Sequence, residues 1–270
     1  MDRPIGILDS GVGGLTVVKE VLRQLPNERI VYIGDSARCP YGSRPREEIV
    51  RFTMEMVRFL LKFDPKALVI ACNTATAVAL DAVRAAVPVP VIGVIDPGAR
   101  AAIRETAGSR IGVIGTVQTI ESGAYAAAIG RTRPDLTVVG IATPELVPLI
   151  ELGWPKEAAR PVLEASLAPV RAAAVDTLVL GCTHYPLIAD WIQDVLGDGV
   201  KLISSATETA AELAAVLTEA GLLRRAPEVP VEERLLLFTT GDVPGFQAIA
   251  ERWLGRAVAI RSAVLNPERV

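Results

Sequence analysis

Two cysteines in this chain stand in nearly identical settings. Residues 67–72 and 177–182 are short apolar runs of strand length that each end in a cysteine, and polar residues then lead into an apolar-periodic segment of helical character. Open parallel sheets bind ligands at the carboxyl ends of their strands, and helix N-terminal amides attract anions and lower the pKa of a thiol. Cys72 and Cys182 are therefore candidates for activated groups that face an anionic ligand.

Two thiols at equivalent positions of a duplicated fold would face each other across the cleft between its halves. Inversion of a carbon stereocentre needs one group that removes a proton from one face and a second group that delivers a proton to the other. Each thiol also needs a polar neighbour that assists the gain and loss of its proton. Asp9, at the end of the first apolar run, is expected to serve Cys72, and His184 stands two residues after Cys182. We therefore interpret these four residues as candidate catalytic groups.

Each of these residues also has a purely structural interpretation. A single cysteine at the end of a strand is more often a small buried hydrophobic residue than a catalyst. Asp9 could cap the helix that follows it, and His184 could hydrogen-bond at a helix terminus. The repetition in both halves of the chain is what favours function. Cys39 has no counterpart in the second half and is expected to be structural.

Three other kinds of site fit the motifs less well. Residues 9–14 (DSGVGG) resemble a dinucleotide loop, but Thr16 replaces the third glycine, and no Gly-Lys-Ser/Thr follows as in a phosphate-binding loop. A zinc site built from the two cysteines and His184 lacks paired ligand spacing. No lysine lies in a candidate site loop, which argues against a pyridoxal phosphate Schiff base. We expect neither a metal nor a cofactor.

The elements that must position these residues alternate between strand and helix. The stretch from residue 5 to Cys72 is close in length to that from residue 111 to Cys182, which indicates a diverged internal duplication. This pattern predicts two similar α/β lobes with parallel-rich sheets flanked by helices, related by pseudo-two-fold symmetry, with the active site in the cleft between them. Strands are expected at residues 5–8, 30–33, 91–95, 137–141 and 235–238, within the cysteine runs 67–72 and 177–182, and, with the loop that follows it, at 110–116. Helices are expected at 15–25, 46–62, 119–128, 156–174 and 208–219.

The lobes are expected to be discontinuous in sequence. Residues 1–96 together with 206–270 are predicted to form the first lobe, because the last strand and helix would return to complete it, and residues 97–205 the second. Residues 96–98 (DPG) are expected to interrupt the chain. Pro161 and Pro169 are expected to bound or kink the helical stretch that contains them.

Composition excludes some classes of protein. Of the 270 residues, 50% are hydrophobic and only 4% are aromatic, and the net charge is −3. This charge gives no electrostatic footprint for nucleic acid, and an apolar run long enough to span a membrane is absent. Three cysteines suit reduced thiols better than a disulfide framework. We therefore expect a soluble, cytoplasmic protein.

Four motifs closely resemble those of bacterial glutamate racemases, and the resemblance covers nearly the whole chain in order. They are residues 7–14 (ILDSGVGG), 34–42 (GDSARCPYG), 71–76 (ACNTAT) and 181–186 (GCTHYP). The resemblance implies a cofactor-independent interconversion of L- and D-glutamate by two thiols, which supplies D-glutamate for peptidoglycan. Cys72 would take the proton from D-glutamate and Cys182 from L-glutamate, with a homodimer allowed but not required.

The same resemblance implies a set of substrate-binding residues. They are Asp9, Ser10, Tyr41, Gly42, Asn73, Thr74, Thr116, Glu151, Thr183 and His184. Aspartate racemases typically carry an acidic residue where this chain has His184, which favours glutamate. An aspartate or related amino-acid racemase remains the nearest alternative enzyme, and a non-catalytic two-lobed protein that binds a small ligand is the alternative from another class.

Overall fold

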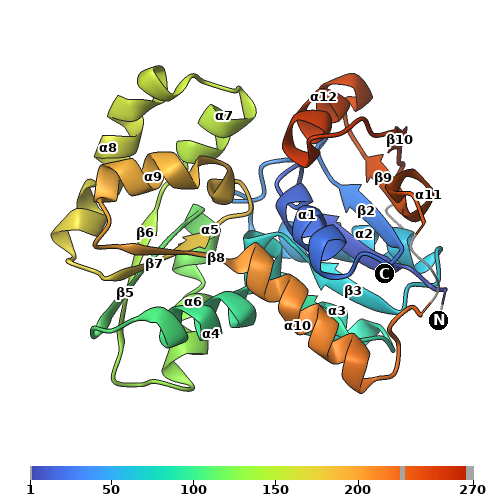
Figure 1. Cartoon of the computed structure of the whole chain (residues 1–270), viewed down its shortest axis with the longest axis horizontal. Helices are drawn as coiled ribbons and strands as arrows, with labels where there is room; N and C mark the ends of the chain where they lie inside the picture. Colours follow the sequence, from blue (N-terminus) through green and yellow to red (C-terminus); the bar gives the residue numbers. More distant parts are fainter. Residues whose placement is uncertain (1, 226–228, 266–270) are drawn as a thin grey trace.

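The computed structural model describes residues 2–225 and 229–265 of the chain. The backbone forms two parallel sheets, each covered by helices on both faces, and Figure 1 shows the two resulting lobes side by side. We call the sheet that contains the N-terminal strand, with its helices, the first lobe, and the other sheet with its helices the second lobe. The expected fold class, two α/β lobes with parallel sheets, is confirmed.

The first lobe contains a six-stranded sheet in the order β10-β9-β2-β1-β3-β4. Its strands are β1 (Ile5–Asp9), β2 (Ile30–Gly34), β3 (Ala67–Ile70), β4 (Val91–Gly93), β9 (Leu235–Thr239) and β10 (Ile260–Ser262). Its helices are α1 (Leu15–Gln24), α2 (Arg46–Leu61), α3 (Asn73–Ala86), α10 (Ser205–Glu219), α11 (Val231–Arg234) and α12 (Val243–Leu254). The strands are short apolar runs because both faces of a parallel sheet are covered.

The second lobe contains a four-stranded sheet in the order β6-β5-β7-β8. Its strands are β5 (Arg110–Gly115), β6 (Thr137–Ala142), β7 (Thr177–Gly181) and β8 (Lys201–Ser204). Its helices are α4 (Ile95–Glu105), α5 (Val117–Glu121), α6 (Ala124–Gly130), α7 (Leu146–Glu151), α8 (Lys156–Ala172), the 3-10 helix η1 (Tyr185–Ile188) and α9 (Ala189–Leu196). Helices α4 and α6 cover one face, and α7, α8 and α9 cover the other.

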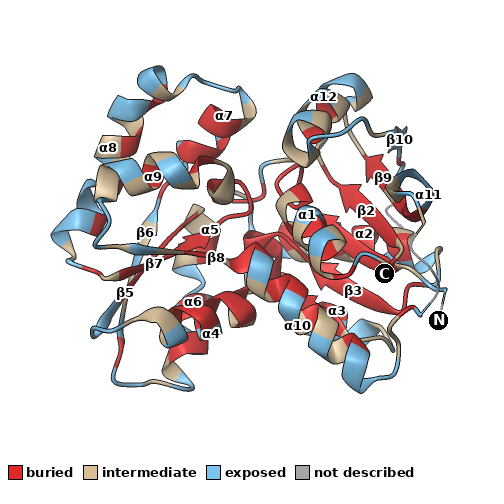
Figure 2. Cartoon of the chain, viewed as in Figure 1, coloured by how far each residue is buried: buried red, intermediate tan, exposed pale blue. Residues whose placement is uncertain are grey.

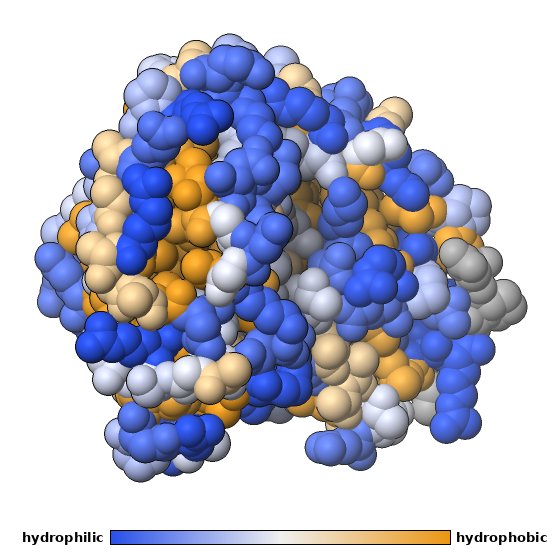
Figure 3. Space-filling model, turned by 60° about the vertical axis from the view of Figure 1, so that its left-hand side comes forward, coloured by the Kyte–Doolittle hydropathy of each residue, from blue (hydrophilic) through white to orange (hydrophobic). Residues whose placement is uncertain are grey.

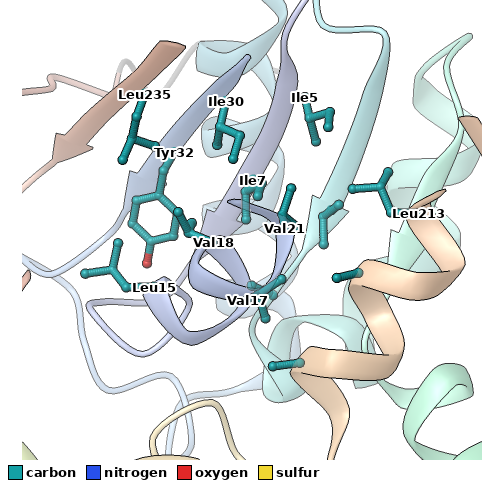
Figure 4. Close-up of a cluster of buried hydrophobic side chains, with 14 of the residues drawn as sticks. Ile5, Ile7, Leu15, Val17, Val18, Val21, Ile30, Tyr32, Leu213 and Leu235 are labelled. Atoms are coloured by element: carbon teal, nitrogen blue, oxygen red, sulfur yellow. The ribbon is translucent and has the colours of Figure 1, made fainter. Parts of the chain in front are cut away.

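Aliphatic side chains hold each helical layer against its sheet. Figure 4 shows Val17, Val18 and Val21 of α1 packed over Ile7 of β1, with Leu213 of α10 beside them. The buried residues follow the sheets and the inner faces of the helices (Figure 2), so each lobe has a core of its own on both sides of its sheet. Each core fixes where its strands end, and the strand ends carry the candidate site residues.

The two sheets share a strand order that matches the duplication inferred above. In the first sheet β1 lies between β2 and β3, with β4 beyond β3, and in the second sheet β5 lies between β6 and β7, with β8 beyond β7. Strand β9 pairs with β2, so the end of the chain returns to the first sheet. The boundaries at residues 96 and 205 stay a prediction. Helix α10 lies between the lobes and packs on α1 of one and α4 of the other.

The structure corrects several predictions about helices. The expected interruption at residues 96–98 is wrong, because these residues form the first turn of α4, where Pro97 is tolerated since the first N–H groups of a helix have no partner within it. Helix α8 runs unbroken through Pro161 and Pro169. The helix expected at 119–128 is two helices, separated at Gly123, which has a φ of 65°.

The surface adds two further observations. No helix in the described part of the chain is long and apolar enough to cross a membrane. Figure 3 shows apolar side chains on the second lobe, bordered by hydrophilic ones. Neither observation tests whether the protein forms a homodimer, which stays a prediction.

Candidate active site

Cys72 sits at the junction of β3 and α3. It is the N-cap residue of α3, and its Sγ accepts a 3.4 Å hydrogen bond from the Ala75 amide. The same sulfur lies 3.5 Å from Ser10 Oγ, which follows β1. Cys72 is 5% exposed, so the thiol is held by the helix terminus and one hydroxyl in a site that is nearly closed to water.

The expected lowering of the Cys72 pKa by the helix terminus is wrong. Burial raises the pKa of this thiol to about 12, and the negative charge of Asp9 adds to the rise. The hydrogen bond between Cys72 and Ser10 and the one donated by the Ala75 amide oppose the rise but are weaker. Desolvation of a buried anion exceeds the stabilisation from one amide and one hydroxyl, so Cys72 holds its proton at neutral pH.

Cys182 follows β7 in a different local setting. Its motif leads into a 3-10 helix, η1, and only then into α9, so the expected match to the first motif is incomplete. His184 compensates for the missing α-helix terminus, because its Nδ1 lies 3.6 Å from Cys182 Sγ. The other ring nitrogen, Nε2, is 2.9 Å from Glu151 Oε1, at the end of α7. Cys182, His184 and Glu151 therefore form one connected chain.

The contacts of His184 keep it charged. Burial alone would lower the pKa of the imidazole, but the hydrogen bonds to Cys182 and Glu151 raise it to about 10. An imidazolium beside a sulfur atom stabilises negative charge on that sulfur. The two thiols thus differ: Cys72 is held as a neutral thiol, whereas Cys182 has a cation as its partner.

Asp9 does not hydrogen-bond to Cys72 in the structure. The Gly11 amide donates to Asp9 Oδ2 over 2.9 Å, and the Thr183 hydroxyl donates to Oδ1 over 3.5 Å. In this arrangement Asp9 acts on Cys72 only through its charge, which raises the pKa of the thiol. Ser10 is the residue that contacts the thiol directly. Burial raises the pKa of Asp9, and the charge of His184 opposes the rise.

Hydroxyl groups join the lobes at the rim of the cleft. Thr74 Oγ1 of α3 lies 2.8 Å from Thr116 Oγ1, which caps α5, and 3.3 Å from Thr119 Oγ1. The Gln118 amide donates to the Gly42 carbonyl over 3.1 Å. The expected residues Gly42, Thr74 and Thr116 are thus brought together, and Thr119 joins them although sequence reasoning missed it. Its spacing of three residues from Thr116 was the available signal.

Asn73 presents a hydrogen-bond donor that has no partner. The side chain is 2% exposed, its Oδ1 accepts a 2.6 Å bond from Tyr125, and its Nδ2 has no partner among the described residues. The Tyr41 hydroxyl donates to Asp35 and its ring packs on Phe52, 5.7 Å between ring centroids, and its role in substrate binding stays a prediction. Asn73 Nδ2 is therefore the donor that is open to a ligand.

Two residues near the site carried no local signal in the sequence. Trp253, on α12, meets His184 edge to face at 5.8 Å between ring centroids. Cys39, expected to be structural, lies with its Sγ 4.0 Å from Glu151 Oε1. A pocket of about 250 Å³ opens there, lined by Gly11, Val12, Ser36, Cys39, Glu151, Asp242, Gly245, Phe246 and Ile249. The mouth of the site thus combines both lobes and the C-terminal segment.

Within residues 2–225 and 229–265, no group of three or more His, Cys, Asp or Glu side chains is arranged to hold a metal ion. The described thiols are free rather than disulfide-bonded.

Comparisons with known proteins identify the family. The model of the Asp/Glu/hydantoin racemase family matches residues 5–213. The glutamate racemase of Enterococcus faecalis is 50% identical over 252 residues, which are 93% of this chain and 92% of that protein. The crystal structure of a glutamate racemase isoform from Bacillus anthracis is 48% identical, with a TM-score of 0.94 over 97% of this chain and 98% of that chain.

Two further solved structures are less similar to this chain. The glutamate racemase of Francisella tularensis in complex with D-glutamate is 34% identical, with a TM-score of 0.90 over 99% of this chain and 98% of that chain. The aspartate racemase of Picrophilus torridus is 19% identical, with a TM-score of 0.57 over 81% of this chain and 94% of that chain, and shares the fold alone. The chain therefore belongs to the Asp/Glu/hydantoin racemase family and, within it, to the glutamate racemases, as the resemblance of its motifs predicted.

Proposed function

We propose that this protein interconverts L- and D-glutamate by proton transfer between two thiols, Cys72 and Cys182. The observation that carries the proposal is the pair of cysteines at the ends of topologically matched strands, each with its own polar partners. Two opposed acid/base groups are what inversion at Cα requires.

The different partners of the two thiols, together with the family resemblance, suggest a direction for each. In the L-to-D direction, Cys182 acts as a thiolate next to the His184 imidazolium and takes the Cα proton. The Cα–H bond breaks, its electron pair remains on the substrate, and a new S–H bond forms on Cys182. The Cys72 thiol, whose pKa of about 12 keeps it protonated, then delivers its proton to the opposite face. The D-to-L direction reverses each step.

The cleft offers donors for the substrate carboxylates. Asn73, with its free Nδ2, and Thr74 follow Cys72 in the chain, Ser10 Oγ lies 3.5 Å from Cys72 Sγ, and Thr183 follows Cys182. The α-proton of an amino acid is weakly acidic, so the site must hold the substrate firmly and stabilise the charge that develops as the proton leaves. A donor that is already desolvated, as Asn73 Nδ2 is, binds an anion without first losing water. We assign substrate binding to these residues and proton transfer to the two thiols.

The first test uses the protein freed of metals and cofactors. It is incubated with L-glutamate, and separately with L-aspartate, in deuterated water, while optical rotation and Cα deuterium are followed by polarimetry and NMR. We expect inversion of glutamate with deuterium in the product. Inversion of aspartate instead would assign the chain to the alternative substrate, and no exchange with either amino acid would favour the ligand-binding alternative.

Cysteine variants test the two-thiol mechanism itself. Cys72→Ala and Cys182→Ala should each lose racemisation while glutamate binding is largely kept, because each removes one of two essential proton carriers. Cys39→Ala is the matched control, since it removes the remaining thiol, and it should keep activity. Full activity in either of the first two variants would overturn the mechanism.

Two further predictions concern where the protein acts in the cell and how its product is used. Reduced thiols at the site suit a cytoplasmic location, and D-glutamate from this reaction would enter peptidoglycan synthesis, as the family resemblance implies. A homodimer is one assembly to test, by light scattering.

A further inference from the structure

Tyr125 lies between the two cysteine motifs. It belongs to α6 of the second lobe and is 3% exposed. Its hydroxyl donates a 2.6 Å hydrogen bond to Asn73 Oδ1, and Asn73 directly follows Cys72. Its Cε2 lies 3.3 Å from the position that a Cβ on Gly181 would occupy, and Gly181 directly precedes Cys182. One side chain thus contacts the sequence neighbours of both thiols.

The ring of Tyr125 is held in a tight slot. The missing side chain of Gly98, on α4, leaves room for the hydroxyl, since a Cβ there would lie 3.4 Å from Tyr125 Oη. Apolar side chains from β5, β7, α4 and α6 enclose the rest of the ring. Side chains in close-packed cores occupy single rotamers. The hydroxyl is therefore presented to Asn73 from a fixed position.

This contact determines which end of the Asn73 amide faces the cleft. An asparagine carries an acceptor oxygen and a donor NH₂ group, and a 180° turn of the amide exchanges them. Burial raises the pKa of Tyr125, and an interaction with Ser205 opposes the rise, as a hydrogen bond donated to the phenolic oxygen does. The single phenolic hydrogen then goes to Asn73 Oδ1. Asn73 Nδ2 is left buried and without a partner in the described structure.

We propose that Tyr125 is a positioning residue that orients the Asn73 amide, so that both Nδ2 hydrogens are available to a carboxylate of the substrate. This inference rests on the proposed function, because it requires an anionic substrate beside Cys72. The hydrogen bond joins α6 of the second lobe to α3 of the first. The donor for the substrate is thus set by a residue from the opposite lobe.

The test is a double-mutant cycle with Tyr125→Phe, Asn73→Ala and the double variant. We expect Tyr125→Phe to raise KM about tenfold for both enantiomers, the change that corresponds to one hydrogen bond to a charged group. The kcat should stay within about twofold, since this donor holds the carboxylate equally in the ground state and the transition state. The double variant should have the KM of Asn73→Ala alone, because Tyr125 acts only through Asn73. Multiplicative effects on KM would overturn the proposal.

Tyr185→Phe provides the matched control. Tyr185 is also buried in the second lobe, and its hydroxyl donates over 2.9 Å to the Thr143 carbonyl rather than to Asn73. Its removal should destabilise the protein to a similar degree, and any effect on KM should multiply with that of Asn73→Ala. If the KM effects of Tyr185→Phe and Tyr125→Phe departed equally from simple multiplication with that of Asn73→Ala, the effect would be a general structural one. That result would overturn the positioning role.

A measurement on the wild-type protein tests the same contact without kinetics. In a ¹⁵N-labelled sample, D-glutamate should shift the side-chain amide signals of Asn73, identified by their loss in Asn73→Ala. Unchanged signals at saturating glutamate would overturn the inference. Failure of the wild-type protein to racemise or bind glutamate would instead overturn the proposed function, so the two failures are distinguishable.

Discussion

Replacing Gly13 by alanine tests how closely the two lobes must approach for the site to work. Gly13 lies in the loop after β1, opposite the second cysteine motif. A Cβ built on it would lie 2.6 Å from His184 Nδ1 and closer still to Thr183 Oγ1. Its φ is not in the left-handed region, so the backbone itself accepts alanine. The substitution therefore acts by steric contact between the lobes.

The magnitude follows from the geometry. Ordinary van der Waals contact begins at 3.4 Å. The methyl group is thus about 0.8 Å too close to His184, a separation at which repulsion dominates. His184 cannot easily yield, because Cys182, Glu151 and Trp253 contact it on its other sides. We expect the lobes to part by a few tenths of an ångström up to about 1 Å, and displacements of this size cost about a hundredfold in rate.

The assay compares Gly13→Ala with Gly130→Ala. A Cβ on Gly130, at the end of α6, would meet no atom within 4 Å, so that variant should keep full activity. Initial rates of racemisation from each enantiomer, followed by circular dichroism, should fall about a hundredfold in Gly13→Ala. Its free energy of unfolding should drop by only about 1–3 kcal/mol, the usual cost of overpacking. More than half of the wild-type kcat/KM in a folded Gly13→Ala protein would refute this reasoning.

The remaining predictions concern charge and packing. The pKa of His184 rises from 6.5 to about 10 on folding, so its bound proton stabilises the fold fully below pH 6.5, and that contribution is lost as pH rises towards 10. Urea titrations across this range should show a steeper fall for wild type than for His184→Asn, and parallel curves would contradict it. Lys66→Met should cost about 3–5 kcal/mol in the same assay, because it strands Glu28, 2.5 Å away in a buried ion pair; Lys66→Met combined with Glu28→Gln should recover part of the loss, and no recovery would refute the ion-pair explanation. Trp253→Ala should increase the primary deuterium isotope effect with 2-deuterated L-glutamate, because proton transfer through Cys182 slows when His184 loses its ring contact, whereas an equal increase in the neighbouring Leu254→Ala would argue for a general loss of packing.

The sequence by itself determined the repeated frame of the fold. Short apolar runs bounded by glycine and polar residues identified the main strands, because a strand covered on both faces must be apolar along its length. The two cysteines stood out because each ends such a run. The similar spacing of the runs indicated the duplication, and the two sheets have matching strand orders. These signals are local or periodic, and both kinds survive in a linear sequence.

Helix details were less predictable where local rules conflict with their context. Proline and glycine at residues 96–98 suggested a break, but in the first turn of α4 they cost little. Pro161 and Pro169 remain inside α8, whose leucines pack on the second sheet. Burial of a helical face against a sheet can outweigh the loss of single backbone hydrogen bonds.

Only the tertiary structure decided the chemistry of the site. The helix terminus at Cys72 suggested a lowered thiol pKa, but the pKa depends on burial and on Asp9, which the fold brings in from another strand. Asp9 meets Thr183 of the opposite lobe, and His184 meets Trp253, which lies far along the chain. The Tyr125 hydroxyl of the second lobe likewise donates to Asn73 of the first lobe. The sequence determined which residues can carry protons, whereas their solvation and partners depend on contacts between distant segments, which exist only once both lobes have folded and closed.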